Sequence, residues 1–253
     1  MASASPHMPI AELRRWLERT ERHGRALSAV VPFGVAAIDG ALPHGGIARG
    51  NVHEVIEGGP ASEHAAVATL FAAGIVARIP GPVLWCLRTR DLFAPALARI
   101  GLHPDRVIYC ETYKDRDVLP AMEDGLRCIG LAGVVGEVTK LSLTASRRLQ
   151  LVAGETGVTA LVLRRWRTLD EHKLAGEPTA AMTRWRVAPA ASGPGVFDHL
   201  QRQRWNVELL RVKGGEPHSW IVEACDAQGR LALPAALADR PAAAEEPKFA
   251  DAG

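Results

Sequence analysis

The chain has 253 residues, of which 47% are hydrophobic and 23% are charged. This length and composition are typical of one sizeable globular domain, with room for a small appendage. The formal net charge of +2 excludes any argument for nucleic-acid or membrane binding from overall charge alone. The cysteines are widely spaced without a CxxC pair, which argues against a disulfide framework or a zinc site and favours reduced thiols; they are Cys86, Cys110, Cys128 and Cys225.

The first 27 residues lack the apolar segment of a secretory signal, and residues 10–27 predict a helix with Leu13, Trp16 and Leu17 on one face. The longest apolar run, residues 65–77, is shorter than the roughly 20 residues that span a bilayer. We therefore expect a cytoplasmic protein without membrane contact. Its expected parts are an N-terminal helix (1–27), a core domain (28–235) and a disordered tail (236–253).

Strands and helices alternate along the core. The apolar patterns predict strands at 51–57, 81–87, 106–110, 133–138 and 159–166, with helices between them at 62–78, 92–100, 117–132 and 142–157. This alternation is typical of an α/β fold in which helices flank a mostly parallel sheet. Further strands are expected at 182–189, 205–213 and 218–226, the last two as an antiparallel hairpin at the sheet edge.

The sequence lacks most of the familiar catalytic patterns. The sequence contains no GxSxG and no HExxH, and its nine histidines lack ligand spacing. We therefore expect no catalytic residue, no metal site and no cofactor.

The turn after the first strand of the core can be compared with a phosphate-binding loop. With Gly59 as the first glycine, the phosphate-loop pattern GxxxxGK[ST] falls on His64, Ala65 and Ala66. Methyl groups then replace the lysine and the hydroxyl that hold phosphates and Mg²⁺. From this stretch alone, two interpretations stay open: an ordinary strand-to-helix turn, or a phosphate loop that keeps its outline and has lost its cation and metal ligand.

Longer motifs favour the second interpretation. The segment "VPFGVAAIDGALPHGGIARGNVHEVIEGGP" resembles the start of the RecA core. More closely, "GALPHGGIARGNVHEV", "AMEDGLRC" and "VVGEVTKLSLTASRRLQL" resemble the ImuA family of RecA-like proteins. The resemblance covers about residues 28–230 and implies a RecA-like core preceded by the N-terminal helix.

The resemblance also implies a function. The ImuA family belongs to a bacterial DNA-damage-induced (SOS) mutagenesis cassette and acts as an accessory factor of error-prone translesion synthesis. Its implied partner is ImuB, a polymerase-like protein, followed by an error-prone replicative-type polymerase and RecA. Two alternatives stay open: a regulatory inhibitor of RecA or FtsZ, as in SulA-type proteins, and a DNA-dependent ATPase with a degenerate loop.

RecA's catalytic positions map onto unsuitable residues. The loop lysine and threonine fall on Ala65 and Ala66, and the acidic residue of the Walker B strand falls on Glu137. The water-activating glutamate falls in the region of Arg88 and Arg90, and the polar sensor near Arg164 or Arg165. The resemblance therefore implies a retained fold and a lost ATPase.

Two binding surfaces are implied by the comparison with RecA. The first, for single-stranded DNA, consists of basic residues interleaved with tryptophans. The alternative is that the basic residues form a solvated face and the tryptophans pack the hairpin. The basic residues are Arg164, Arg165, Arg167, Lys173, Arg184 and Arg186. The second is for protein. Leu13, Trp16 and Leu17 would dock on another copy or on their own core, and the edge strand around Tyr109, with Met122 and Leu126, would accept a segment of ImuB.

Overall fold

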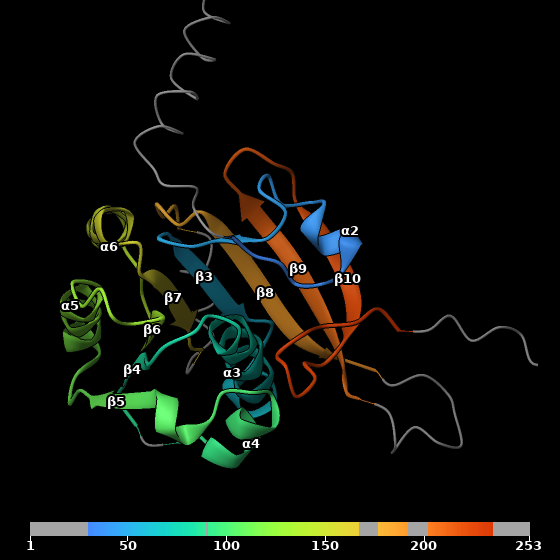
Figure 1. Ribbon diagram of the computed structural model, residues 1–253, viewed down its shortest axis with the longest axis horizontal. Helices are drawn as coiled ribbons and strands as arrows, with labels where there is room; N and C mark the ends of the chain where they lie inside the picture. The colour runs from blue at the N-terminus through green and yellow to red at the C-terminus, as the bar shows by residue number, and fades with distance from the viewer. Residues whose placement is uncertain (1–29, 90, 167–176, 192–201, 235–253) are drawn as a thin grey trace, which may run out of the picture.

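A computed structural model describes residues 30–89, 91–166, 177–191 and 202–234 (Figure 1). The expected N-terminal helix and C-terminal tail lie outside these residues. Of the helices within the described ranges, none is long and apolar enough to cross a membrane.

An eight-stranded sheet forms the centre of the molecule, in the order β10-β9-β8-β3-β7-β6-β4-β5. Strands β5, β4, β6, β7, β3 and β8 run parallel, whereas β9 and β10 continue the sheet antiparallel. The predicted α/β class and the C-terminal hairpin at the sheet edge are therefore confirmed. The strands are β3 (Val52–Glu57), β4 (Val83–Leu87), β5 (Val107–Glu111), β6 (Gly133–Val138), β7 (Thr159–Arg164), β8 (Thr183–Ala190), β9 (Arg204–Val212) and β10 (His218–Glu223).

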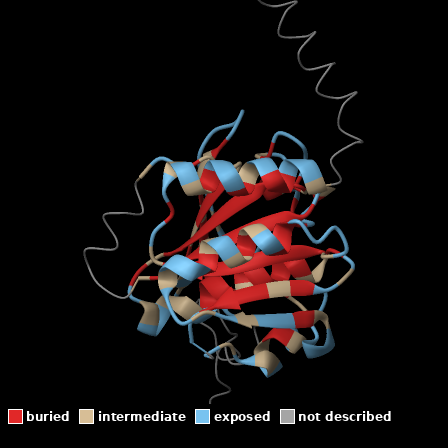
Figure 2. Ribbon diagram, turned by 90° about the vertical axis from the view of Figure 1, so that its left-hand side faces the viewer, coloured by how far each residue is buried: buried red, intermediate tan, exposed pale blue. Residues whose placement is uncertain are grey.

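Helices cover both faces of this sheet, and their inner sides are buried while their outer sides meet solvent (Figure 2). One face carries α3 (Ala61–Ala77) and α4 (Ala94–Arg99), and the other carries α5 (Asp115–Leu126) and α6 (Leu143–Thr156). Because both faces of the parallel strands are covered, β3, β6 and β7 are buried along their whole length. Short elements not expected from the sequence complete the fold: β1 (Val30–Val31), α2 (Ala36–Asp39), β2 (Ile47–Ala48) and a 3₁₀ turn (Pro104–Arg106).

Aromatic side chains fill the core between α3 and the sheet. The rings of Phe33, Phe71 and Trp185 meet at centroid distances of 5.3 to 5.7 Å. Trp185 and Trp205 are fully buried. These two tryptophans therefore pack the sheet, as the alternative to base stacking predicted.

His53, the second residue of β3, is held neutral inside the core. Its Nε2 lies 2.8 Å from the carbonyl oxygen of Ala48, so Nε2 carries the proton. Its Nδ1 accepts from the hydroxyl of Thr183 at 2.7 Å, and that hydroxyl in turn accepts from Trp185 Nε1. Burial, opposed only by the Ala48 carbonyl, lowers the pKa of His53 to about 4.

This buried histidine makes stability depend on pH. The unfolded chain takes up a proton at His53 near pH 6.5, whereas the folded protein resists it until about pH 4. The contribution of neutral His53 to the free energy of unfolding is therefore fully present above pH 6.5. As pH falls to 4, this contribution decreases by about 3 kcal/mol. We expect urea unfolding at pH 7 and pH 4 to show a smaller loss in His53→Gln than in the wild type. The exposed His103→Gln is the control, and equal losses in all three proteins would contradict the prediction.

Candidate functional site

The connection from β3 to α3 is a turn of three residues. Strand β3 ends at Glu57 and α3 begins at Ala61, so residues 61–66 are helical. The N–H groups of Glu63 and His64 both donate to the Pro60 carbonyl, at 3.0 and 3.1 Å. A phosphate loop needs more residues than this and free N–H groups pointing at the ligand. The retained loop outline expected from the sequence is therefore not observed.

His64 packs onto this turn. A Cβ atom on Gly59 would lie 2.4 Å from His64 Cε1, so the imidazole rests directly on the glycine backbone. His64 Nδ1 lies 3.1 Å from the Pro60 carbonyl oxygen. Space that a phosphate would take beside Gly59 is thus filled by the protein's own side chain.

The guanidinium of Arg165 occupies the adjoining position, at the carboxyl ends of β3, β6 and β7. It donates to Glu57 at 2.8 Å and to Glu137 at 2.9 Å. It also donates to the Ala65 carbonyl at 3.1 Å and to the Thr69 hydroxyl at 2.9 Å, which ties it to the first turns of α3. Ligands of open α/β sheets bind at this carboxyl edge, so a buried ion pair now stands at the place where a ligand would enter.

Each carboxylate around Arg165 has a further partner. Trp85 Nε1 donates to Glu137 at 2.8 Å, and the N–H of Trp166 donates to Glu57 at 2.8 Å. Burial raises the pKa of Glu57, although the Trp166 N–H and Arg165 oppose this. Burial also disfavours the charge of Arg165, but Glu137 and Glu57 outweigh it and raise its pKa. Arg165 thus stays charged.

A second buried cluster lies on the opposite face of the sheet, around Glu54. Its carboxylate accepts from Arg164 at 2.8 Å, from Arg184 at 2.7 Å and from the Thr179 hydroxyl at 3.0 Å. Arg164 also donates to the Thr139 carbonyl. The two clusters together join three carboxylates to three guanidinium groups, so their formal charges cancel.

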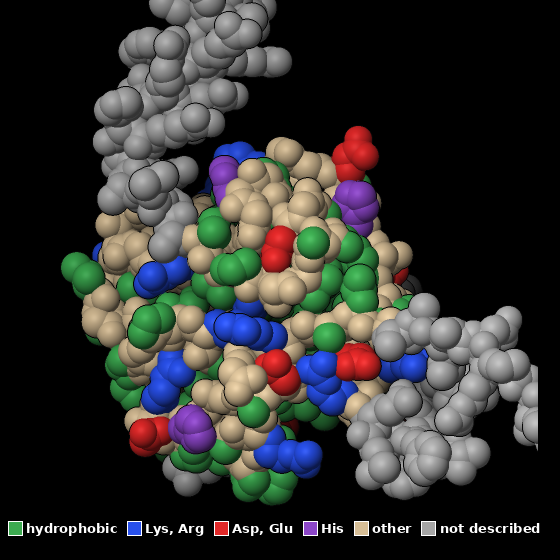
Figure 3. Space-filling view, turned by 45° about the vertical axis from the view of Figure 1, so that its right-hand side comes forward, with side chains coloured by type: hydrophobic (Ala, Val, Ile, Leu, Met, Phe, Trp, Pro, Cys, Tyr) green, Lys and Arg blue, Asp and Glu red, His purple; other side chains and the backbone are tan. Residues whose placement is uncertain are grey.

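This pairing removes most of the expected DNA surface. Arg164, Arg165 and Arg184 are 1%, 9% and 8% exposed, because the strand ends place them beside buried glutamates. Arg186 is half-buried and pairs with Glu208 at 2.5 Å. Arg167 and Lys173 lie outside the described residues. In Figure 3, Lys and Arg side chains are scattered among acidic and apolar ones and form no continuous basic area on that face.

The expected protein-binding residues differ in their exposure to solvent. Tyr109 is 41% exposed on β5, which is an edge strand as predicted. Met122 and Leu126 are fully buried, so their expected place on a surface is corrected. Met122 lies flat on β6, where a Cβ on Gly136 would come within 2.1 Å of its sulfur. Leu13, Trp16 and Leu17 fall outside the described residues.

Comparisons with known proteins identify the family. Proteins named ImuA from two strains of Caulobacter vibrioides are 37% identical to this chain over 235 residues, which cover 88% of this chain and 96% of theirs. The chain belongs to the ImuA family. No protein-family model matches the sequence.

In this ImuA-family chain, two residues of the site were missed by the reasoning from sequence. Glu57 and Thr69 both bind Arg165, yet neither corresponds to a RecA catalytic position. The available signal was a glutamate at the end of a predicted core strand, directly before Gly-Gly, since such a buried carboxylate requires a cationic partner. Within the described ranges, no three His, Cys, Asp or Glu side chains are grouped to hold a metal ion.

Arg165→Met tests the role of the ion pair at the sheet edge. The change leaves Glu57 and Glu137 buried without their cation, so we expect a loss of about 3–5 kcal/mol in the free energy of unfolding at pH 7. Lowering the pH to 5 should restore part of this loss, because burial raises the pKa of Glu57 and the folded chain then takes up a proton there more readily than the unfolded chain. Urea denaturation at both pH values measures the effect.

Arg186→Met is the matched control. It breaks a half-exposed ion pair with Glu208, for which we expect a loss of about 0–1 kcal/mol. If Arg165→Met cost no more than Arg186→Met, the buried pair would not be what stabilises this edge of the sheet.

Proposed function

We propose that the chain is a non-catalytic adaptor with a RecA-like core, which acts in SOS-induced error-prone translesion synthesis by binding ImuB. Membership of the ImuA family supports the role in DNA-damage-induced mutagenesis. The proposal that the chain is not catalytic rests on the Arg165 guanidinium, which is bound by two carboxylates and by the Ala65 carbonyl. Ala65 is the position where a nucleotide-binding loop would have its lysine.

The geometry opposes a triphosphate in several ways that reinforce one another. Phosphate oxygens arriving beside Ala65 would meet the carboxylates Glu57 and Glu137, and both of these already share the single guanidinium of Arg165. Releasing Arg165 from them would leave buried charges unpaired, at a cost of several kcal/mol. The short turn at Gly59 offers no loop to compensate.

An ATP-binding assay tests this part of the proposal. We expect no saturable binding of a fluorescent ATP analogue with a Kd below about 1 mM, and no phosphate release with or without single-stranded DNA. A bacterial RecA protein in the same assay is the positive control. DNA-stimulated hydrolysis by the purified chain would instead support the alternative of a DNA-dependent ATPase.

The edge strand β5 is the proposed surface for ImuB. It ends the sheet, so its outer N–H and C=O groups meet no further strand among the described residues. Ile108 and Tyr109 on this strand are 50% and 41% exposed, and Tyr113 just beyond it is 98% exposed. An exposed edge with apolar side chains suits the addition of a strand from a partner, with backbone hydrogen bonds supplying affinity and side-chain contacts supplying specificity.

Charge substitution at each edge of the sheet separates this surface from general destabilisation. We expect Ile108→Asp with Tyr109→Asp to reduce co-purification with ImuB by about tenfold or more, because central apolar contacts dominate interface energies. Ile221→Asp, on the opposite edge strand β10 at similar exposure, is the control and should leave binding unchanged. Equal binding by both variants would contradict the proposal, and capture of RecA or FtsZ in place of ImuB would favour the inhibitor alternative.

A further inference from the structure

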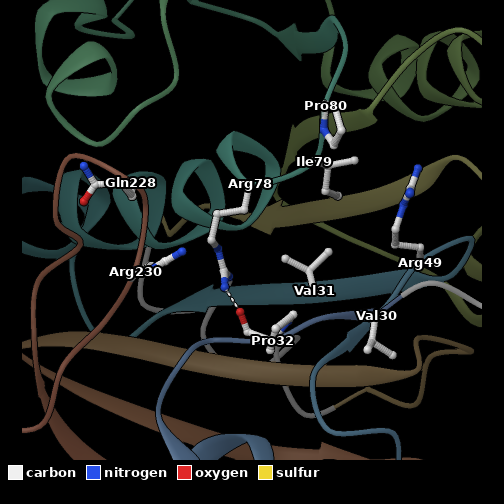
Figure 4. Close-up of a pocket in the computed structure, with 9 residues that line it drawn as sticks. All are labelled: Val30, Val31, Pro32, Arg49, Arg78, Ile79, Pro80, Gln228 and Arg230. Atoms are coloured by element: carbon white, nitrogen blue, oxygen red, sulfur yellow. Dashed lines mark hydrogen bonds between the residues drawn. The ribbon is translucent and has the colours of Figure 1, made fainter.

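A pocket of roughly 440 Å³ lies at the far end of α3 from Ala65, where the helix ends and residues 78–80 lead toward β4 (Figure 4). Strand β1 and the loop around residues 228–230 form its other walls. Three of the lining residues are arginines and none is acidic; the lining consists of Val30, Val31, Pro32, Arg49, Arg78, Ile79, Pro80, Gln228 and Arg230.

The charge of Arg78 is only partly compensated. Its Nε donates to the Gly74 carbonyl at 3.0 Å and its Nη1 to the Pro32 carbonyl, while its Nη2 is buried without a partner. Its guanidinium carbon lies 5.1 Å from the centre of the Phe33 ring. Burial lowers the pKa of Arg78 to about 10, and the nearby charge of Arg230 acts in the same direction.

Charges facing Arg78 from the neighbouring elements do not neutralise it. Asp39 and Asp226 favour its charged form, whereas burial raises the pKa of Cys225 to about 12, so that thiol is uncharged. However, the Asp39 carboxylate accepts from the N–H groups of Phe33 and Gly34. Asp226 likewise accepts from the N–H groups of Gln228 and Arg230. Both carboxylates are thus engaged by their own loops, and neither forms an ion pair with Arg78 or Arg230 in the described part of the chain.

A second orphaned nitrogen lies at the other end of the pocket. Arg49 Nε is buried and has no hydrogen-bond partner. Buried polar atoms in folded proteins nearly always have a partner, so one without a protein partner indicates a site for a water or an ion. In Figure 4, Arg78 and Arg230 approach each other on one side of Val31, and Arg49 lies on the other side.

We propose that this pocket binds a small phosphate monoester. The phosphate would lie between Arg78 and Arg230, where a dianion offsets two adjacent cations and a single carboxylate would offset only one. The remainder of the ligand would contact the apolar wall of Val31, Ile79 and Pro80. The volume is within the range of small-molecule sites, about 300–1,000 Å³. This site is separate from the proposed contact with ImuB and does not depend on it.

Arg230→Gln is the decisive variant. Arg230 is exposed and its side chain forms no ion pair in the described part of the chain, so the change should leave the fold intact. The matched control is Arg147→Gln, an equal loss of charge at an exposed position of α6 on the other side of the sheet. The probes are inorganic phosphate and adenosine monophosphate, titrated by calorimetry at constant ionic strength with chloride as the reference salt.

We expect saturable binding of at least one probe by the wild type and by Arg147→Gln, and binding weaker by about tenfold or more in Arg230→Gln. Tighter binding of adenosine monophosphate assigns the site to a monoester, whereas equal binding assigns it to the phosphate group alone. No saturable binding of either probe by the wild type overturns the site. If both variants weaken binding equally, the anion is attracted by overall charge, which also overturns the site. If neither variant weakens binding, the anion is bound elsewhere, with the same conclusion.

Discussion

The ion pair between Arg165 and the carboxylates of Glu57 and Glu137 links three parallel strands to α3. Each carboxylate lies at the end of its own strand, and the guanidinium reaches the Ala65 carbonyl and the Thr69 hydroxyl on the helix. Burying these charges is costly unless every partner is present. The position of α3 over the sheet edge and the pairing of these side chains therefore depend on each other.

This arrangement fills the carboxyl edge of the sheet with the protein's own side chains. The carboxyl edge of such a sheet is normally completed by ligand contacts. In this chain, ion pairs within the protein occupy the edge. Arg165 forms them on one face, and Arg164 and Arg184 form them with Glu54 on the other. One face holds two carboxylates around one guanidinium and the other holds one carboxylate between two guanidinium groups, so the formal charges cancel over the two clusters together.

The order of elements was largely predictable. Alternating apolar strands and amphipathic helices gave the α/β class, and the Gly-Pro turn gave the C-terminal hairpin, because these signals are local in the sequence. Local signals failed where a position depends on distant residues. Met122 and Leu126 look like ordinary apolar residues of a surface helix, yet their burial is set by Gly136 and by the sheet beneath.

The sequence by itself determined that the lysine and hydroxyl of a phosphate loop are missing at Ala65 and Ala66, and it determined the family. Tertiary structure decided whether the arginines are exposed or buried. In sequence, Arg164, Arg165 and Arg184 look like a solvated basic stretch suited to DNA. In the fold they are buried, because strand register brings Arg165 to Glu57, 108 residues away, and to Glu137, 28 residues away. Whether a charge faces solvent or a buried partner depends on such long-range pairings, which local sequence patterns do not encode.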